Sequence, residues 1–193
     1  MSDLLERRAV VKRLVANRRD LLVVAGLGST AYDLFAAGDH PANFYLWGAM
    51  GGAAMIGLGL ALAQPAKPVL VVTGDGEQLM GMGGLATIGA QRPANLSVVV
   101  IDNERFGETG LQRSHTAYGA DLAGVAKACG FGWTREIRAE TQLGELVDRL
   151  HAKAGPSFAV VKVAPVNPPR VLPARDGVYV KNRFRESLGL GVN

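Results

Sequence analysis

The sequence contains a single cysteine, Cys129, among 193 residues. One thiol excludes a disulfide framework within the chain and any zinc or iron–sulfur site that needs several thiolates. We therefore interpret Cys129 as a small buried hydrophobic residue. Aromatic residues make up only 6% and do not alternate with the basic ones. Nucleic-acid binding is therefore disfavoured despite a net charge of +4, which an anionic ligand or an acidic partner surface would explain as well.

Long hydrophobic runs are also lacking. The longest apolar stretch, at 48–63, is short for a membrane span and rich in glycine. The first twenty residues are charged throughout and do not resemble a signal peptide. We therefore expect a cytoplasmic protein with no membrane contact. A hydrophobic content of 48% is ample for a core, and the length suits one compact domain.

Helical and strand patterns alternate along the chain. The strand segments are continuous runs rich in valine and isoleucine, which indicates strands buried on both faces of a parallel sheet. The fold class expected is a three-layer α/β sandwich of about five strands. Strands are expected at 20–26, 69–73, 96–101, 132–137 and 157–163. Helices are expected at 3–17, 29–38 (capped by Ser29 or Thr30), 51–64, 79–91, 121–130 (capped by Asp121) and 141–154 (capped by Thr141).

We expect residues 1–163 to form the α/β domain and residues 164–193 to form an extended C-terminal tail. Four prolines between 165 and 173 motivate the division. The tail could cross a neighbouring subunit or could be solvated, and the sequence leaves both possibilities open.

Polar residues follow two neighbouring valine-rich runs at the point where each expected strand ends. Asp75 lies between Gly74 and Gly76 after the first run, and Asn103 follows the second. In an open parallel sheet, ligands bind beyond the carboxyl ends of the strands. Exposed N–H groups at a helix start hold phosphate oxygens, and a carboxylate beside an amide oxygen suits Mg²⁺. Taken alone, Gly-Asp-Gly is more often an ordinary turn.

The second half of the pattern gives it specificity. Residues 77–102, 26 in number, separate Gly76 from Asn103. This spacing resembles the thiamine diphosphate fingerprint, in which Gly-Asp-Gly is followed by Asn after some 25 to 30 residues. The segments NFYLWGAMGGAAMIGLGLALA and NERFGETGLQ resemble those of small-subunit 2-oxo acid decarboxylases of the sulfopyruvate and phosphonopyruvate type. The resemblance covers roughly residues 20–163.

The resemblance implies a role for each matching residue. Asp75, Asn103 and the carbonyl of Arg105 would hold Mg²⁺. Met50 would be the bulky residue that keeps thiamine diphosphate bent, and Gly48 would accept a hydrogen bond from its pyrimidine. The cofactor-binding set is Gly48, Met50, Gly74, Asp75, Gly76, Glu77, Asn103, Arg105, Gly107 and Glu108, with backbone N–H groups of Gly76, Glu77, Gly107 and Glu108 on the diphosphate.

Such enzymes also need a glutamate on a separate pyrimidine-binding domain, which these motifs do not include. The resemblance therefore implies the β subunit of a heteromeric decarboxylase, active only with a separate α subunit and acting on a small 2-oxo acid. A carboligase or lyase half of the same superfamily is an alternative, and so is a regulatory subunit that keeps the pocket without catalysis.

The loop after Asn103 is expected to face the site. Met50, Gln112 and His115 are the candidate catalytic residues, and Arg113 could join Gln112 and His115 in contacting a substrate anion. A rival interpretation begins at Gly26, where G-x-G-x-x-A follows a strand, as in dinucleotide-binding proteins. It would need an acidic residue ending a second strand about 20 residues later, and Asp39 comes too early.

Overall fold

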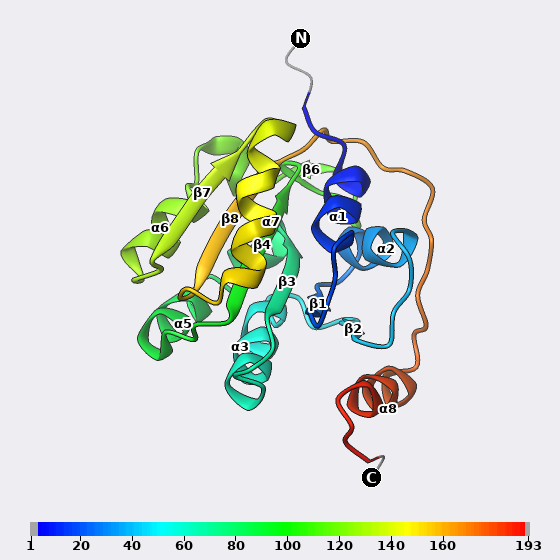
Figure 1. The fold of residues 1–193 in the computed structure, drawn as a ribbon. Helices are drawn as coiled ribbons and strands as arrows, with labels where there is room; N and C mark the ends of the chain where they lie inside the picture. Colours follow the sequence, from blue (N-terminus) through cyan, green and yellow to red (C-terminus); the bar gives the residue numbers. More distant parts are fainter. Residues whose placement is uncertain (1–3, 192–193) are drawn as a thin grey trace.

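Six parallel strands form the main sheet in the computed structural model, which describes residues 4–191 (Figure 1). Every pairing between neighbours in this sheet is parallel. In spatial order the strands are β2 (Asn43–Tyr45), β1 (Leu22–Ala25), β3 (Val69–Gly74), β4 (Leu96–Asp102), β8 (Ser157–Lys162) and β7 (Trp133–Ile137). The α/β prediction is confirmed, with one strand more than expected. Strand β2 was missed because three residues carry no recognisable run.

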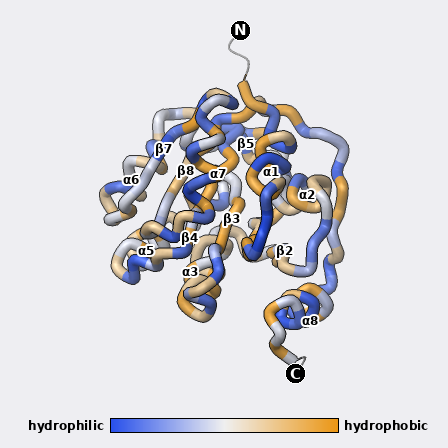
Figure 2. Tube along the Cα trace, in the orientation of Figure 1, coloured by the Kyte–Doolittle hydropathy of each residue, from blue (hydrophilic) through white to orange (hydrophobic). Residues whose placement is uncertain are grey.

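Helices cover both faces of the sheet. Successive residues of β3 point to opposite sides, so that Leu70 and Val72 join one buried cluster while Val69 and Val71 join the other. Figure 2 shows this central strand in the hydrophobic colour. The first cluster includes α1 (Arg7–Val15), α2 (Ser29–Ala36) and α7 (Leu143–Ala152), and the second α3 (Ala53–Ala63), α5 (Gly84–Gln91) and α6 (Leu122–Ala128). No helix within residues 4–191 is long and apolar enough to cross a membrane.

The helix expected at 79–91 is two helices. A short helix, α4 (Asp75–Met80), begins at the end of β3, and α5 begins only at Gly84. A Cβ on Gly81 would lie 2.3 Å from the carbonyl oxygen of Gly51, so the chain breaks where two backbones meet. The remaining short elements are the β5 (Arg105–Phe106) and β6 (Gln112–Arg113) hairpin and the 3₁₀ turns η1 (His115–Tyr118) and η2 (Glu140–Gln142).

Of the three helix caps predicted, one is confirmed. Asp121 accepts a hydrogen bond from the N–H of Gly124 at 2.8 Å. The prediction for α2 was wrong, because Gly28 occupies the cap position with φ 71° and Thr30 donates its hydroxyl to the carbonyl of Gly26. The prediction for α7 was wrong too, because the η2 turn takes up residue 141 before the helix begins.

The tail is not extended throughout, which corrects the prediction for 164–193 over its last described part. Residues Gly177–Ser187 form α8, capped by the side chain of Asp176. Val180 and Phe184, four residues apart, are buried on one face of this helix. The extended part runs over the chain's own domain (Figure 1), where the carbonyl of Pro169 accepts a hydrogen bond from Arg8 at 2.9 Å.

Candidate functional site

A cavity of about 380 Å³ opens at the carboxyl ends of β3 and β4. Its walls come from the loop between β1 and α2, from the turn between β3 and α4, and from the loop that follows β4. Nine of the predicted site residues line it: Met50, Gly74, Asp75, Gly76, Glu77, Asn103, Arg105, Gly107 and Glu108. The sheet therefore brings together most of the residues that the motifs selected.

The Gly-Asp-Gly turn leaves room for a ligand only because its residues are small. Strand β3 ends at Gly74 and helix α4 starts at Asp75, where the cap residue Gly74 has no side chain to accept a hydrogen bond. The first N–H groups of a helix have no acceptor within it, so those of Gly76 and Glu77, which line the cavity, are candidate donors to a ligand. A Cβ on Gly76 would lie 2.5 Å from Cε1 of Phe106. A larger residue here would push into the wall of the cavity.

Asp75 is a buried acid whose partners are hydroxyl groups. It is 2% exposed, and its Oδ2 accepts hydrogen bonds from Ser114 and, at 3.3 Å, from Thr116. Burial raises the pKa of the Asp75 carboxyl to about 6, the hydrogen bond from Ser114 opposes this rise, and the nearby Asp102 adds to it. Within residues 4–191, no lysine, arginine or histidine forms an ion pair with Asp75.

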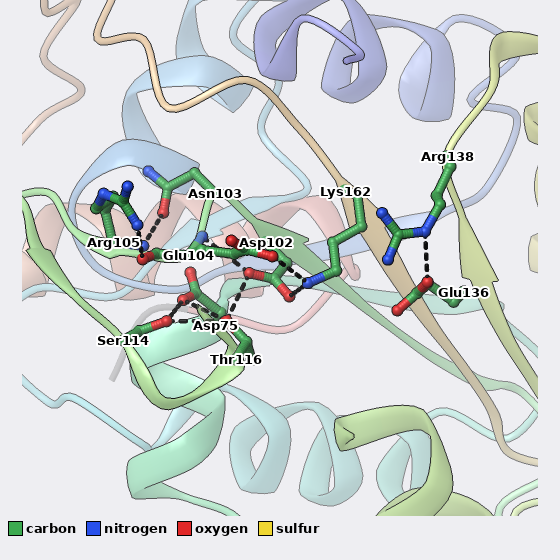
Figure 3. A network of polar contacts seen from close by, with 10 residues as sticks. All are labelled: Asp75, Asp102, Asn103, Glu104, Arg105, Ser114, Thr116, Glu136, Arg138 and Lys162. Carbon is green, nitrogen blue, oxygen red and sulfur yellow. Dashed lines mark hydrogen bonds and ion pairs between the residues drawn. The ribbon is translucent and has the colours of Figure 1, made fainter. Parts of the chain in front are cut away.

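Asn103 begins a tight turn at the end of β4. Its Oδ1 accepts the N–H of Arg105 at 2.9 Å, and Glu104 between them has φ 60° (Figure 3). An amide oxygen has two lone pairs, so one acceptor position on Asn103 is left. Among the described residues no three His, Cys, Asp or Glu side chains gather as a metal-binding group. A cation beside Asp75 would therefore need amide or carbonyl oxygens as further ligands.

Glu77 is more than a source of a backbone N–H. Its carboxylate is buried and accepts a hydrogen bond from the hydroxyl of Thr73 at 3.0 Å. A Cβ on Gly26 would lie 1.8 Å from Glu77 Oε2, so the acid packs directly under the end of β1. Burial raises the pKa of this carboxyl. The glycine at 26 is thus explained by the Glu77 side chain, which sequence reasoning did not anticipate.

Met50 also lines a second cavity, and the remaining predicted residues divide between that cavity and the surface. Met50 is 38% exposed, and its Cε would lie 3.6 Å from a Cβ on Gly76. His115 lines a second cavity of about 350 Å³ together with Met50 and stacks edge-on to Phe106. The other three, Gly48, Gln112 and Arg113, line neither cavity.

Gln112 and Arg113 belong to the exposed β5–β6 hairpin. The amide of Gln112 bonds to Thr109 at 2.9 and 3.0 Å, and the guanidinium of Arg113 lies over the ring of Tyr118. Both side chains are therefore engaged within the loop itself. Gly48 has φ 73° with open space around it, which places a glycine-only turn just before Met50.

Several residues at the site were not selected from the sequence. Ser114 and Thr116 contact Asp75, and Lys162 reaches Asp102 from β8. Ser29, Thr30 and Arg7 line the first cavity from α1 and α2. Arg170 crosses from the tail and pairs with Glu108 at 3.1 Å. Ser29 and Thr30 lie within the G-x-G-x-x-A segment at Gly26, and Ser114 and Thr116 lie in the loop after Asn103. No local motif marks Arg7, Lys162 or Arg170, which reach the site from distant parts of the chain.

The chain has relatives among known proteins. Residues 27–161 match the family described as thiamine pyrophosphate enzyme, C-terminal TPP binding domain. The chain is 41% identical over 188 residues to phosphonopyruvate decarboxylase of Streptomyces viridochromogenes, covering 93% of this chain and 45% of that protein. It is 41% identical over 164 residues to sulfopyruvate decarboxylase subunit beta of Methanothermobacter thermautotrophicus, covering 85% of each.

A solved structure has a similar fold. Benzoylformate decarboxylase from Polynucleobacter necessarius matches with a TM-score of 0.69 and 22% identity over 86% of this chain and 34% of that one, a likeness that bears on the fold alone. The dinucleotide interpretation loses its basis, because β2 ends at Tyr45 with no acid to hold a ribose. The family match spans the turn at Asp75, the turn at Asn103 and the cavity between them, and the chain therefore belongs to the family of thiamine pyrophosphate enzymes, as their C-terminal TPP-binding domain.

Proposed function

We propose that this chain holds the diphosphate of thiamine diphosphate through Mg²⁺, with Asp75, Asn103 and the carbonyl of Arg105 as protein ligands. The observation that carries the proposal is the state of Asp75. It is a carboxylate, 2% exposed, at a cavity wall, with hydroxyl partners and no ion pair within residues 4–191. A buried charge needs compensation, and a divalent cation would supply it. One carboxylate with amide and carbonyl oxygens is also the ligand chemistry that Mg²⁺ prefers.

Backbone groups would hold the diphosphate beside the cation. The N–H groups of Gly76 and Glu77 start helix α4 at the cavity wall, and Gly107 and Glu108 face them from the loop after β5. Free N–H groups at a helix start favour phosphate oxygens. The proposal gives Met50 the role of supporting the bent cofactor, since its side chain lies against Gly76. Gly48 would offer its carbonyl to the pyrimidine.

We further propose that the chain is the β subunit of a 2-oxo acid decarboxylase. Bound thiamine diphosphate supplies a carbon nucleophile for the substrate carbonyl and an electron sink for the charge left by loss of CO₂. The chain's own residues would bind and orient that cofactor and exclude water from it. The acids named in the two relatives, sulfopyruvate and phosphonopyruvate, set the proposed substrate class, a 2-oxo acid with a second anionic group. His115 and Gln112 stay candidates for contacts with it, and His115 is the better placed.

A partner subunit completes the proposal. The chain spans about half the length of the phosphonopyruvate decarboxylase that it matches, and 85% of a relative whose name includes subunit beta. We propose that a separate α subunit brings the pyrimidine domain with its activating glutamate. The test is decarboxylation of sulfopyruvate or phosphonopyruvate by the chain alone and by the chain mixed with such a subunit. Activity of the chain alone would contradict the heteromer.

The metal proposal is tested by Asp75→Ala in the reconstituted complex. We expect Mg²⁺-dependent retention of thiamine diphosphate after desalting to be abolished, because the buried charge that holds the cation is gone. Asp148→Ala, which removes an exposed acid on α7, is the matched control and should retain the cofactor like the unmodified chain. Equal retention by the Asp75 variant would remove the metal assignment.

A further inference from the structure

Lys162 is a buried cation at the end of β8, outside the set of residues so far given a role. It is 7% exposed and lies opposite Asp102 in the parallel pairing of β4 with β8. Its Nζ donates to Asp102 Oδ2 at 2.8 Å and to Glu104 Oε1 at 2.9 Å (Figure 3). One side chain therefore binds the residues on both sides of Asn103.

The backbone at the second of these acids is in an unfavourable conformation. Glu104 has φ 60°, a left-handed conformation that is unfavourable for a residue with a Cβ. The N–H of Glu104 donates to Asp102 Oδ1 at 2.9 Å, and its carbonyl accepts from Ser114 N–H at 3.0 Å. The turn thus depends on contacts from outside itself, and Lys162 supplies the charged ones.

The two buried acids of the site differ in their partners: Asp102 is paired with a cation, and Asp75 is not. Asp102 is 1% exposed and is paired with Lys162, whereas the hydroxyl of Thr116 lies between Asp102 and Asp75. Lys162 and Asp75 lie on opposite sides of Asp102 in Figure 3. The ammonium group of Lys162 therefore pairs with the acids of the turn and does not pair with Asp75.

We propose that Lys162 is a positioning residue for the metal site: by binding Asp102 and Glu104 together, it holds the turn that presents the Asn103 oxygen and the Arg105 carbonyl. This inference rests on the proposed function for what the turn presents. It differs from a purely structural role, in which Lys162 would only satisfy the buried charge of Asp102. The contact with Glu104 distinguishes the two roles. Glu104 is half exposed, so its charge needs no buried partner, and a purely structural role would not require this contact.

The test uses the full chain in its complex, with Mn²⁺ as the probe in the presence of thiamine diphosphate, and electron paramagnetic resonance to measure free Mn²⁺. We expect Lys162→Met to lower Mn²⁺ affinity at least tenfold and Glu104→Gln to lower it severalfold. Lys127→Met, which removes an exposed lysine on α6, is the matched control and should leave affinity unchanged. Affinity within twofold of the unmodified chain for Lys162→Met would overturn the proposal.

A double variant, Asp102→Asn with Lys162→Met, distinguishes positioning from stabilisation. It removes the buried charge together with its partner, so thermal stability should recover relative to Lys162→Met. We expect Mn²⁺ affinity to stay low, because the anchor on Glu104 is still missing. Recovery of both stability and affinity would show that Lys162 only neutralises Asp102, and would overturn the positioning role.

Amide hydrogen exchange without metal or cofactor keeps this inference separate from the metal proposal. In Lys162→Met we expect residues 103–106 to exchange at least tenfold faster, with β1 and β3 unchanged. If the unmodified chain binds no Mn²⁺ with thiamine diphosphate, the metal proposal fails, and the exchange data still decide whether Lys162 holds the turn. Unchanged exchange at 103–106 would overturn the inference whatever the metal data show.

Discussion

The hydroxyl of Ser114 donates a hydrogen bond to Oδ2 of Asp75, a residue 39 positions earlier in the chain. The contact joins the loop after β6 to the turn after β3, so that a loop residue fixes the rotamer of the buried acid. Thr116 extends the contact to Asp102 at 2.9 Å. The acid proposed to bind the cation is therefore held in place before any ligand arrives.

Replacing Ser114 by alanine should weaken cation binding without unfolding the domain. A hydrogen bond to a charged group contributes about 1.5–3 kcal/mol, part of which Thr116 would replace. We expect a three- to tenfold loss of Mn²⁺ affinity, measured with thiamine diphosphate present. Thr87→Ala, at an exposed position of α5, is the control. Unchanged affinity in Ser114→Ala would show that Asp75 needs no support from this loop.

Adding one methyl group at Gly76 should block the cavity. The new Cβ would lie 2.5 Å from the ring of Phe106, which lines the cavity, so this ring would have to move. We expect Gly76→Ala to lose thiamine diphosphate binding, measured by calorimetry, while its circular dichroism stays unchanged. Gly59→Ala in α3, where nothing lies within 4 Å, is the matched control and should bind normally. Normal binding by Gly76→Ala would place the diphosphate elsewhere.

The strongest sequence signals were those with local causes. The continuous valine runs predicted β3 and β4 because strands buried on both faces have no polar alternation. Asp121 was recognised as a cap because an N-cap side chain bonds its own next turn. The motifs at Asp75 and Asn103 indicated one cavity because parallel strands end at the same edge of a sheet.

What the sequence did not predict depends on contacts between distant segments. Lys162 is 60 residues from Asp102, and Ser114 reaches Asp75 only through a loop that has no pattern of its own. The helix break at Gly81 follows from the backbone of Gly51, thirty positions earlier. Helix α8 was not predicted because the four prolines before it indicated an extended tail. Tertiary contacts decided the first three of these features, whereas α8 begins at a local cap, Asp176.

Helix α8 should contribute to stability through Phe184. This ring is 7% exposed and meets Phe44 of β2 edge-on, with 5.8 Å between centroids. Truncating a buried phenylalanine to alanine costs about 3–5 kcal/mol, and less where the site can collapse. We expect Phe184→Ala to lower the free energy of unfolding in urea by about 2–4 kcal/mol. Val178→Ala, on the exposed face of the same helix, should change it by less than about 0.5 kcal/mol. If Phe184→Ala lowered the free energy of unfolding by no more than Val178→Ala does, α8 would not dock on β2.

The ion pair between Asp39 and Arg183, at 2.6 Å, should make the docking of α8 depend on pH. Burial acts to raise the pKa of Asp39, but hydrogen bonds from Arg183 and Tyr45 outweigh it and lower the pKa below its ordinary value. A carboxyl whose pKa is lower in the folded state stabilises that state above its unfolded pKa, and this contribution is lost as the pH falls through the folded value. Because Asp39 is 36% exposed, solvent screening limits the contribution to below about 1 kcal/mol.

We expect the difference in unfolding free energy between the unmodified chain and Asp39→Asn to be present at pH 6 and to shrink toward pH 3. Asp148→Asn changes an exposed acid that forms no ion pair among the described residues, and it should show no such difference at either pH. A difference for Asp39→Asn that persists unchanged to pH 3 would mean that its carboxylate does not carry the docking.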